Sequence, residues 1–186
     1  MVWNPYNGEQ YIDFPQVESW CKALVAAHPE WFSMEEIGRS HRGKSIFLVT
    51  VGDHSSDPSQ NPALWLDGGT HAPEWTGVMA ALHTLSRWAE RLKAGDKATQ
   101  DQFRSRTAYV VPCISPDGFQ AMCEGSPFIR SSLRPAKEGT HAVGLRPSDL
   151  TGDGSIRWMR WKHPAGPWVT DPDVPMWMRH RTLDDD

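Results

Sequence analysis

The sequence predicts an α/β layer fold, because short apolar segments with strand character alternate with a segment of helical periodicity. Residues 46–51 and 63–67 are two such apolar runs, separated by a polar connector that contains a proline. A helical pattern over residues 73–92 follows, and a third apolar run covers residues 107–113. Strand, helix and strand in this order are typical of helices packed on a sheet.

Capping residues and periodicity predict two helices. Asp13 precedes Phe14 and Pro15, which is the usual order of an N-cap residue and a proline in the first helical turn. The helix over residues 73–92 carries an apolar stripe of Val78, Leu82, Leu85, Ala89 and Leu92. After the third strand, the Pro-Asp-Gly sequence at residues 116–118 predicts a turn.

The composition is that of an ordinary globular chain. It has 186 residues, 39% hydrophobic and 23% charged, with a formal net charge of −4, which fits a single domain over residues 1–186. The mild acidity argues against a nucleic-acid partner, and the apolar runs are too short for a membrane span. The first residues show no basic and apolar leader, so a cytoplasmic location is expected. The three cysteines are widely spaced and predict neither a disulfide framework nor a cysteine zinc site.

The pattern changes after residue 123. Residues 124–186 show no clear helical or strand period and are predicted to be a loop-rich insertion region. Either this is a large functional loop, or its partners in the sheet are missing, and the second explanation is favoured. Four of the ten tryptophans lie in the last 29 residues, where packing is the commoner role for such a cluster.

The same region contains a segment, residues 149–160, that partly matches a calcium-binding EF-hand loop. Asp149, Thr151, Asp153 and Gly154 occupy the first, third, fifth and sixth places of that loop. Arg160 occupies the twelfth place, where the loop needs a bidentate carboxylate. A plain acidic turn is therefore favoured over a calcium site.

His71 and Glu74 are the candidate metal ligands. His71 follows the strand region at residues 63–67 and Glu74 lies at the start of the long helix, so both lie outside the carboxyl end of a strand, where open α/β sheets bind ligands. Imidazole and carboxylate groups are both normal zinc ligands, and Gly68 and Gly69 allow a tight turn before His71. On spacing alone, a loop histidine and a first-turn acid that complements the helix dipole is the stronger alternative.

Three longer segments extend this pattern. They are IGRSHRGKSI at residues 37–46, ALWLDGGTHAPEW at residues 63–75 and VVPCISPDGF at residues 110–119. Together they resemble the zinc carboxypeptidases of the M14 family, clearly over about residues 36–118. The resemblance implies a mixed, largely parallel sheet flanked by helices, apparently incomplete here, in the N-terminal portion of an M14-like peptidase domain.

The resemblance also implies an activity. It is that of a zinc-dependent metallocarboxypeptidase acting on a peptide or small amide substrate, in which His71 and Glu74 match two ligands of a zinc ion that activates water. Arg130 falls where the family carries an arginine that stabilises the oxyanion, and Arg134 is the competing candidate.

A structural alternative for these two arginines is that both are solvated or pair with acids such as Glu124 and Glu138.

The sequence departs from the family at several positions. A third zinc ligand, an Asn-Arg pair, a tyrosine for the substrate carboxylate and a late glutamate as general base cannot be placed. The downstream histidines lack the family's context; they are His141, His163 and His180. Pro73 stands where the family commonly has an arginine, which affects the expected substrate contacts but not the zinc ligands.

Two alternative functions stay open at this point. The chain could be a non-catalytic binding module that acts through its tryptophan-rich end, since the general base and the third ligand are missing. It could also be a deacylase of N-acyl amino acids, because relatives of this fold act on such amides.

Overall fold

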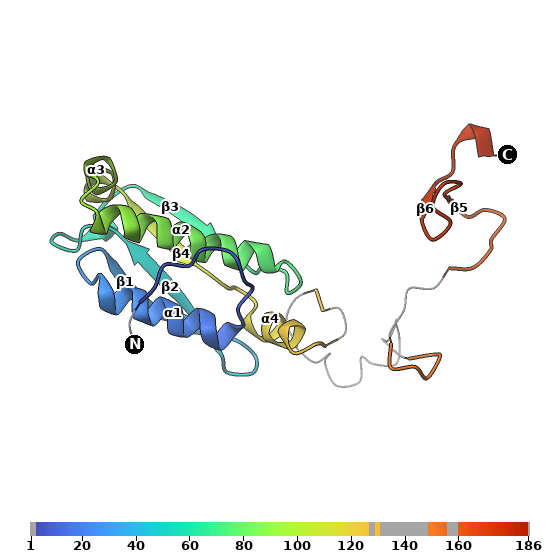
Figure 1. The fold of residues 1–186 in the computed structure, drawn as a ribbon, viewed down its shortest axis with the longest axis horizontal. Coiled ribbons are helices and arrows are strands. Elements are labelled where there is room, and N and C mark those ends of the chain that lie inside the picture. Colours follow the sequence, from blue (N-terminus) through green and yellow to red (C-terminus); the bar gives the residue numbers. More distant parts are fainter. Residues whose placement is uncertain (1–2, 127–128, 131–148, 156–159, 186) are drawn as a thin grey trace. The chain divides into compact units, whose positions relative to one another are not determined.

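The computed structural model describes residues 3–126, 129–130, 149–155 and 160–185 (Figure 1). The contacts within the chain group it into two compact units, residues 1–144 and residues 145–186. The single domain predicted over residues 1–186, with a loop-rich insertion over residues 124–186, stays a prediction.

A four-stranded mixed sheet forms the centre of the first unit. Its strands are β1 (Phe32–Arg39), β2 (Ser45–Val51), β3 (Ala63–Asp67) and β4 (Thr107–Val111), in the spatial order β1-β2-β4-β3. Strand β2 pairs antiparallel with β1 and with β4, whereas β3 pairs parallel with β4. The predicted mixed sheet is confirmed. Among the described strands, β3 and β4 form the one parallel pair.

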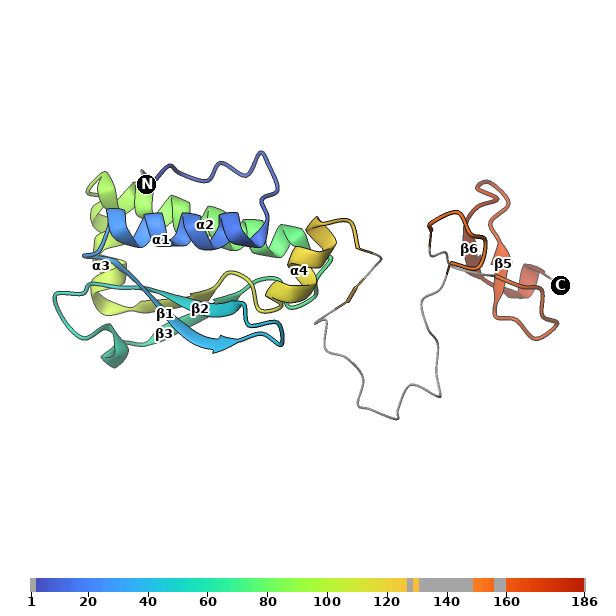
Figure 2. The ribbon, with the colours of Figure 1, turned by 90° about the horizontal axis from the view of Figure 1, so that it is seen from below.

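Two long helices, α1 (Phe14–Ala27) and α2 (Trp75–Lys93), lie side by side over one face of this sheet (Figure 2). Helix α1 begins with a capping box, in which the Asp13 carboxylate accepts the Gln16 N–H and the Gln16 side chain accepts the Asp13 N–H. Both predicted helices are therefore confirmed. Their apolar faces meet the sheet in a core whose fully buried side chains include Val17, Leu24, Phe32, Val49, Val51, Val78, Leu82, Leu85, Phe103, Val110 and Phe119.

The structure contains three elements that the sequence did not predict: β1, the short helix α3 (Lys97–Ser105) and a 3-10 turn, η1 (Pro58–Gln60). Strand β1 lies at the sheet edge, where only its first residue, Phe32, is buried, so it lacks a clear alternation. Helix α3 is polar and buries little besides Phe103. Elements with so few buried positions carry little hydrophobic periodicity.

The prediction of a turn at residues 116–118 was wrong, because these residues form the first turn of α4 (Pro116–Cys123). A proline is compatible with the first helical position, where its missing N–H costs no hydrogen bond. Phe119 of this helix then packs into the core.

The second unit contains a small antiparallel sheet of β5 (Trp168–Thr170) and β6 (Met178–His180), followed by a 3-10 turn, η3 (Leu183–Asp185). These strands were not predicted, because three residues are too few to show an alternating pattern. In the described part of the chain no helix is long and apolar enough to span a bilayer.

Candidate metal centre

The loop that carries both candidate ligands joins the end of β3 to the start of α2. Its backbone passes very close to its neighbours, since a Cβ on Gly68 would lie 2.6 Å from the Gly77 carbonyl oxygen and 2.8 Å from that of Pro112. Gly69 has a φ of 64°, a left-handed conformation that favours glycine. The two glycines therefore let the chain turn tightly before it reaches His71.

Hydrogen bonds tie this loop to the segment that follows β4. The Ile114 N–H donates to the Gly68 carbonyl at 2.9 Å. Ser115 makes two such bonds, from its N–H to the Gly69 carbonyl at 3.0 Å and from its hydroxyl to the Thr70 carbonyl at 2.9 Å. The three loop residues that precede the first candidate ligand are thereby held in place.

The side chains of His71 and Glu74 face one another. Nδ1 of His71 lies 2.8 Å from Oε1 of Glu74, and the two side chains are 32% and 58% exposed. Glu74 is the N-cap residue of α2, but its carboxylate makes no capping hydrogen bond. The carboxylate is therefore directed at the imidazole rather than at the free N–H groups of the helix.

This pair has the donor atoms that a zinc ion requires. An imidazole nitrogen and a carboxylate oxygen are ordinary zinc ligands, and here they lie close enough for one cation to contact both. Their partial exposure gives solvent access, which a catalytic site with an open coordination position needs. The residues present thus fit two positions of a zinc site.

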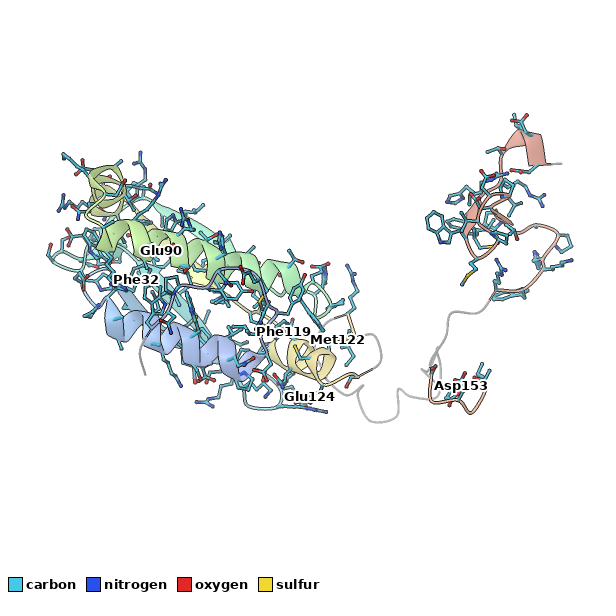
Figure 3. The ribbon with its side chains drawn as sticks, in the orientation of Figure 1. Phe32, Glu90, Phe119, Met122, Glu124 and Asp153 are labelled. Atoms are coloured by element: carbon cyan, nitrogen blue, oxygen red, sulfur yellow. The ribbon has the colours of Figure 1, made fainter. Side chains whose placement is uncertain are left out.

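Arg130 is held beside the same loop through its backbone. The Ala72 N–H donates to the Arg130 carbonyl at 2.8 Å. The preceding residue, Ile129, donates its N–H to Sδ of Met122 at 3.3 Å. Figure 3 labels Met122 on α4, the helix from which this segment leads away. The fold therefore places the exposed Arg130 next to the residue that follows the first candidate ligand.

The sequence offered Arg134 as the alternative to Arg130, and Glu124 and Glu138 as acidic partners of these arginines. Arg134 and Glu138 lie outside the described residues. Glu124, one of the acids considered as a partner, accepts a hydrogen bond from the Gln120 side-chain amide at 2.8 Å.

A model of the zinc carboxypeptidase family matches residues 17–148. The chain belongs to this family. Among its relatives, carboxypeptidase B of Astacus astacus is 29% identical over 159 residues, which are 85% of this chain and 47% of that protein. Human carboxypeptidase A6 is 30% identical over 114 residues, which are 61% of this chain and 25% of the human protein.

Solved structures show the same fold. The crystal structure of thrombin activatable fibrinolysis inhibitor superimposes with a TM-score of 0.64 at 21% identity, and covers 74% of this chain and 33% of that one. The chain therefore has a zinc carboxypeptidase fold, and it spans about half or less of the length of the relatives it matches.

Zinc carboxypeptidases are zinc-dependent, so a full ligand set is expected in such an enzyme. In the part of the chain that the structure describes, no group of three His, Cys, Asp or Glu side chains could hold a metal ion. Of the downstream histidines, His141 lies outside the described residues, and His163 and His180 belong to the second unit. The described residues of the first unit thus offer two candidate ligands, His71 and Glu74, for such a site.

Sequence reasoning missed the role of Asp117. Asp117 is only 2% exposed; its Oδ1 accepts the Ser40 hydroxyl at 2.8 Å and its Oδ2 accepts the Arg42 N–H at 2.9 Å. These bonds tie the turn between β1 and β2 to the start of α4. The Pro-Asp-Gly motif could have signalled this, because an acid in the first turn of a helix that follows a buried strand lies near the end of the sheet.

The segment considered as a calcium loop uses its first acid on its own backbone. The Asp149 carboxylate accepts the N–H groups of Gly154 and Gly152, both at 2.7 Å, and these bonds, the Gly154 bond most of all, lower the pKa of the Asp149 carboxyl. Arg160, at the twelfth place, donates to the Pro175 carbonyl. These contacts fit the plain acidic turn that the sequence favoured over a calcium site.

The tryptophans at the end of the chain are exposed where the structure describes them. These are Trp161, Trp168 and Trp177, and Trp158 lies outside the described residues. The Trp168 ring stacks on the His180 imidazole with centroids 3.9 Å apart. A packing role for these four tryptophans stays a prediction.

Proposed function

We propose that this chain carries part of the active site of a zinc-dependent metallocarboxypeptidase, which hydrolyses a C-terminal peptide bond or a related amide bond. The observation that carries the proposal is the 2.8 Å approach of His71 Nδ1 to Glu74 Oε1, at the carboxyl end of β3. Membership of the zinc carboxypeptidase family supports it. Relatives named carboxypeptidase B and carboxypeptidase A6 support a peptide C-terminus as the substrate.

His71 and Glu74 would hold the zinc ion. With zinc bound, these two residues would hold a Lewis acid, which would polarise the scissile carbonyl and lower the pKa of a bound water. The neutral imidazole and the single carboxylate leave much of a divalent charge uncompensated, which favours binding of the substrate's carbonyl oxygen. The bonds from the segment after β4 to the short loop hold the backbone that presents His71.

Arg130 would stabilise the negative charge that develops on the carbonyl oxygen. When water adds to the carbonyl carbon, this oxygen becomes an anion, and the C–N bond then breaks as the amine leaves with a proton. A guanidinium stays charged at any working pH and donates several hydrogen bonds in one plane. The bond between the Arg130 carbonyl and the Ala72 N–H keeps this residue beside the ligand loop.

A zinc titration tests the ligand assignment. Wild-type chain, His71→Ala and Glu74→Gln are titrated with Zn²⁺ in competition with a chromophoric chelator. We expect each substitution to weaken zinc binding at least about tenfold, because one of two described ligands is lost. His83→Ala, which removes an exposed histidine from α2, is the matched control and should bind zinc as the wild type does. Stoichiometric zinc retained by His71→Ala would contradict the assignment.

An activity assay tests the reaction class and the role of Arg130. In the protein expressed from its complete gene, we expect release of C-terminal residues from peptides to exceed hydrolysis of N-acyl amino acids. Arg130→Ala should lower kcat by about 10²–10³-fold, the usual cost of losing one oxyanion donor, with the zinc content unchanged. Preferred hydrolysis of N-acyl amino acids would instead identify a deacylase of the same fold.

A further inference from the structure

We propose that Ser115 is a positioning residue, which holds His71 in the conformation that binds zinc. The inference rests on the proposed function, because it assigns a role in the same site to a residue that does not itself contact the ion. It follows from two observations: the Ser115 hydroxyl binds the ligand loop, and it does not cap its own helix.

Ser115 is the N-cap residue of α4, yet it does not cap that helix with its side chain. A serine at an N-cap normally accepts a hydrogen bond from an N–H group of the first helical turn. Here the hydroxyl donates instead to the Thr70 carbonyl, 45 positions earlier in the chain, at 2.9 Å. The side chain is thus directed at the ligand loop and not at its own helix.

The backbone of Ser115 strengthens the same attachment. Its N–H donates to the Gly69 carbonyl at 3.0 Å, so one residue holds two successive carbonyl groups of the loop. On the other side of His71, the Ala72 N–H donates to the Arg130 carbonyl at 2.8 Å. His71 therefore lies between two peptide groups that are held by hydrogen bonds. The Ser115 hydroxyl binds the carbonyl of the peptide group that directly precedes His71.

Loss of this hydroxyl would free the peptide group directly before His71. The imidazole could then leave the position in which Nδ1 lies 2.8 Å from the Glu74 carboxylate. Loss of a group that orients a metal ligand typically weakens metal binding, whereas loss of one exposed hydrogen bond lowers the free energy of unfolding only slightly. The expected signature of Ser115 is therefore a change in zinc affinity with a nearly unchanged fold.

The test compares zinc affinity and thermal unfolding of the full 186-residue chain in Ser115→Ala, Ser115→Thr and the wild type. We expect Ser115→Ala to bind Zn²⁺ about fivefold more weakly, the effect of one hydrogen bond, and Ser115→Thr to restore the affinity to within about twofold. Ser105→Ala is the matched control, because the Ser105 hydroxyl also donates to a backbone carbonyl, that of Asp101 at 3.0 Å, but in α3. It should not change zinc affinity.

A second pair of variants keeps the test decisive if Ser115→Ala does not fold. Ser115→Val has the shape of Ser115→Thr without the hydroxyl, so the difference between them isolates the hydrogen bond. Zinc affinity that is equal in these two, or equal in Ser115→Ala and the wild type, would overturn the Ser115 assignment while leaving the His71 ligand in place. Equal affinity of the wild type and His71→Ala would overturn both this inference and the proposed function.

Discussion

Gly68 and Gly77 touch through their backbones, since a Cβ on Gly68 would lie 2.6 Å from the Gly77 carbonyl oxygen. The first residue of the ligand loop is therefore packed directly against the first turn of α2. The same Cβ would lie 2.8 Å from the Pro112 carbonyl oxygen, on the segment after β4. Any side chain at residue 68 must separate the helix from the sheet.

We expect Gly68→Ala to lower the free energy of unfolding by about 2–3 kcal/mol, because overpacking against backbone atoms cannot be relieved by a side-chain rotation. Urea denaturation at neutral pH measures the change. Gly38→Ala is the control, because a Cβ at Gly38 meets no atom within 4 Å, and its effect should be much smaller. Equal effects of the two substitutions would show that the Gly68 contact is not close in solution.

Asp117 gives a second stability prediction. Asp117→Ala leaves the Ser40 hydroxyl and the Arg42 N–H without their buried acceptor, so we expect a loss of about 2–3 kcal/mol in the free energy of unfolding. Asp101→Ala removes an exposed carboxylate that pairs with Lys97 on α3, and should change stability by less than about 1 kcal/mol. A similar small loss for both would contradict a structural role for the Pro-Asp-Gly acid.

The sequence predicted those parts of the fold that carry strong local signals. The N-cap residue Asp13, the apolar stripe of α2 and the glycine pair before His71 each have a physical cause within a few neighbouring residues, and all three were recognised. Elements with few buried residues, such as β1 and α3, gave no such signal. The local sequence could therefore predict the elements with a clear cap or apolar pattern, but not the edge strand β1 or the polar helix α3.

The candidate site shows the same division. The ligand pair could be predicted because His71 and Glu74 are three residues apart, at a strand end and a helix start. The contacts of Ser115 and Arg130 with the loop could not, because each joins segments separated by more than 40 residues. Such bonds depend on the parallel pairing of β3 with β4, which brings the two strand ends together.

His28 makes the stability depend on mildly acidic pH. This residue is only 7% exposed, and its ring meets that of Trp3 edge to face, at 5.0 Å between centroids. Burial lowers the pKa of His28, with Lys93 adding to the effect and Glu30 opposing it. The unfolded chain, whose histidine has the ordinary pKa of about 6.5, therefore binds a proton more readily than the folded chain does.

We expect the free energy of unfolding to fall as the pH drops below about 6.5, because the contribution of neutral His28 is lost as the unfolded state takes up the proton. In His28→Phe, this part of the pH dependence should disappear, so unfolding measured between pH 7 and pH 5 should change less than in the wild type. His83→Gln, at an exposed position of α2, should keep the wild-type slope. An unchanged slope in His28→Phe would contradict the prediction.

Cys113, behind the ligand loop, gives the opposite dependence at high pH. Burial raises the pKa of its thiol from 9.0 to about 12, so the folded chain keeps its proton after the unfolded chain has lost it. The stability that this thiol contributes is fully present below about pH 9 and is lost as the pH rises toward 12. The free energy of unfolding of the wild type should therefore fall more steeply over this range than that of Cys113→Ala. Parallel curves for the two proteins, or rapid alkylation of Cys113 in the folded chain at pH 9, would show that the thiol is not buried behind the loop.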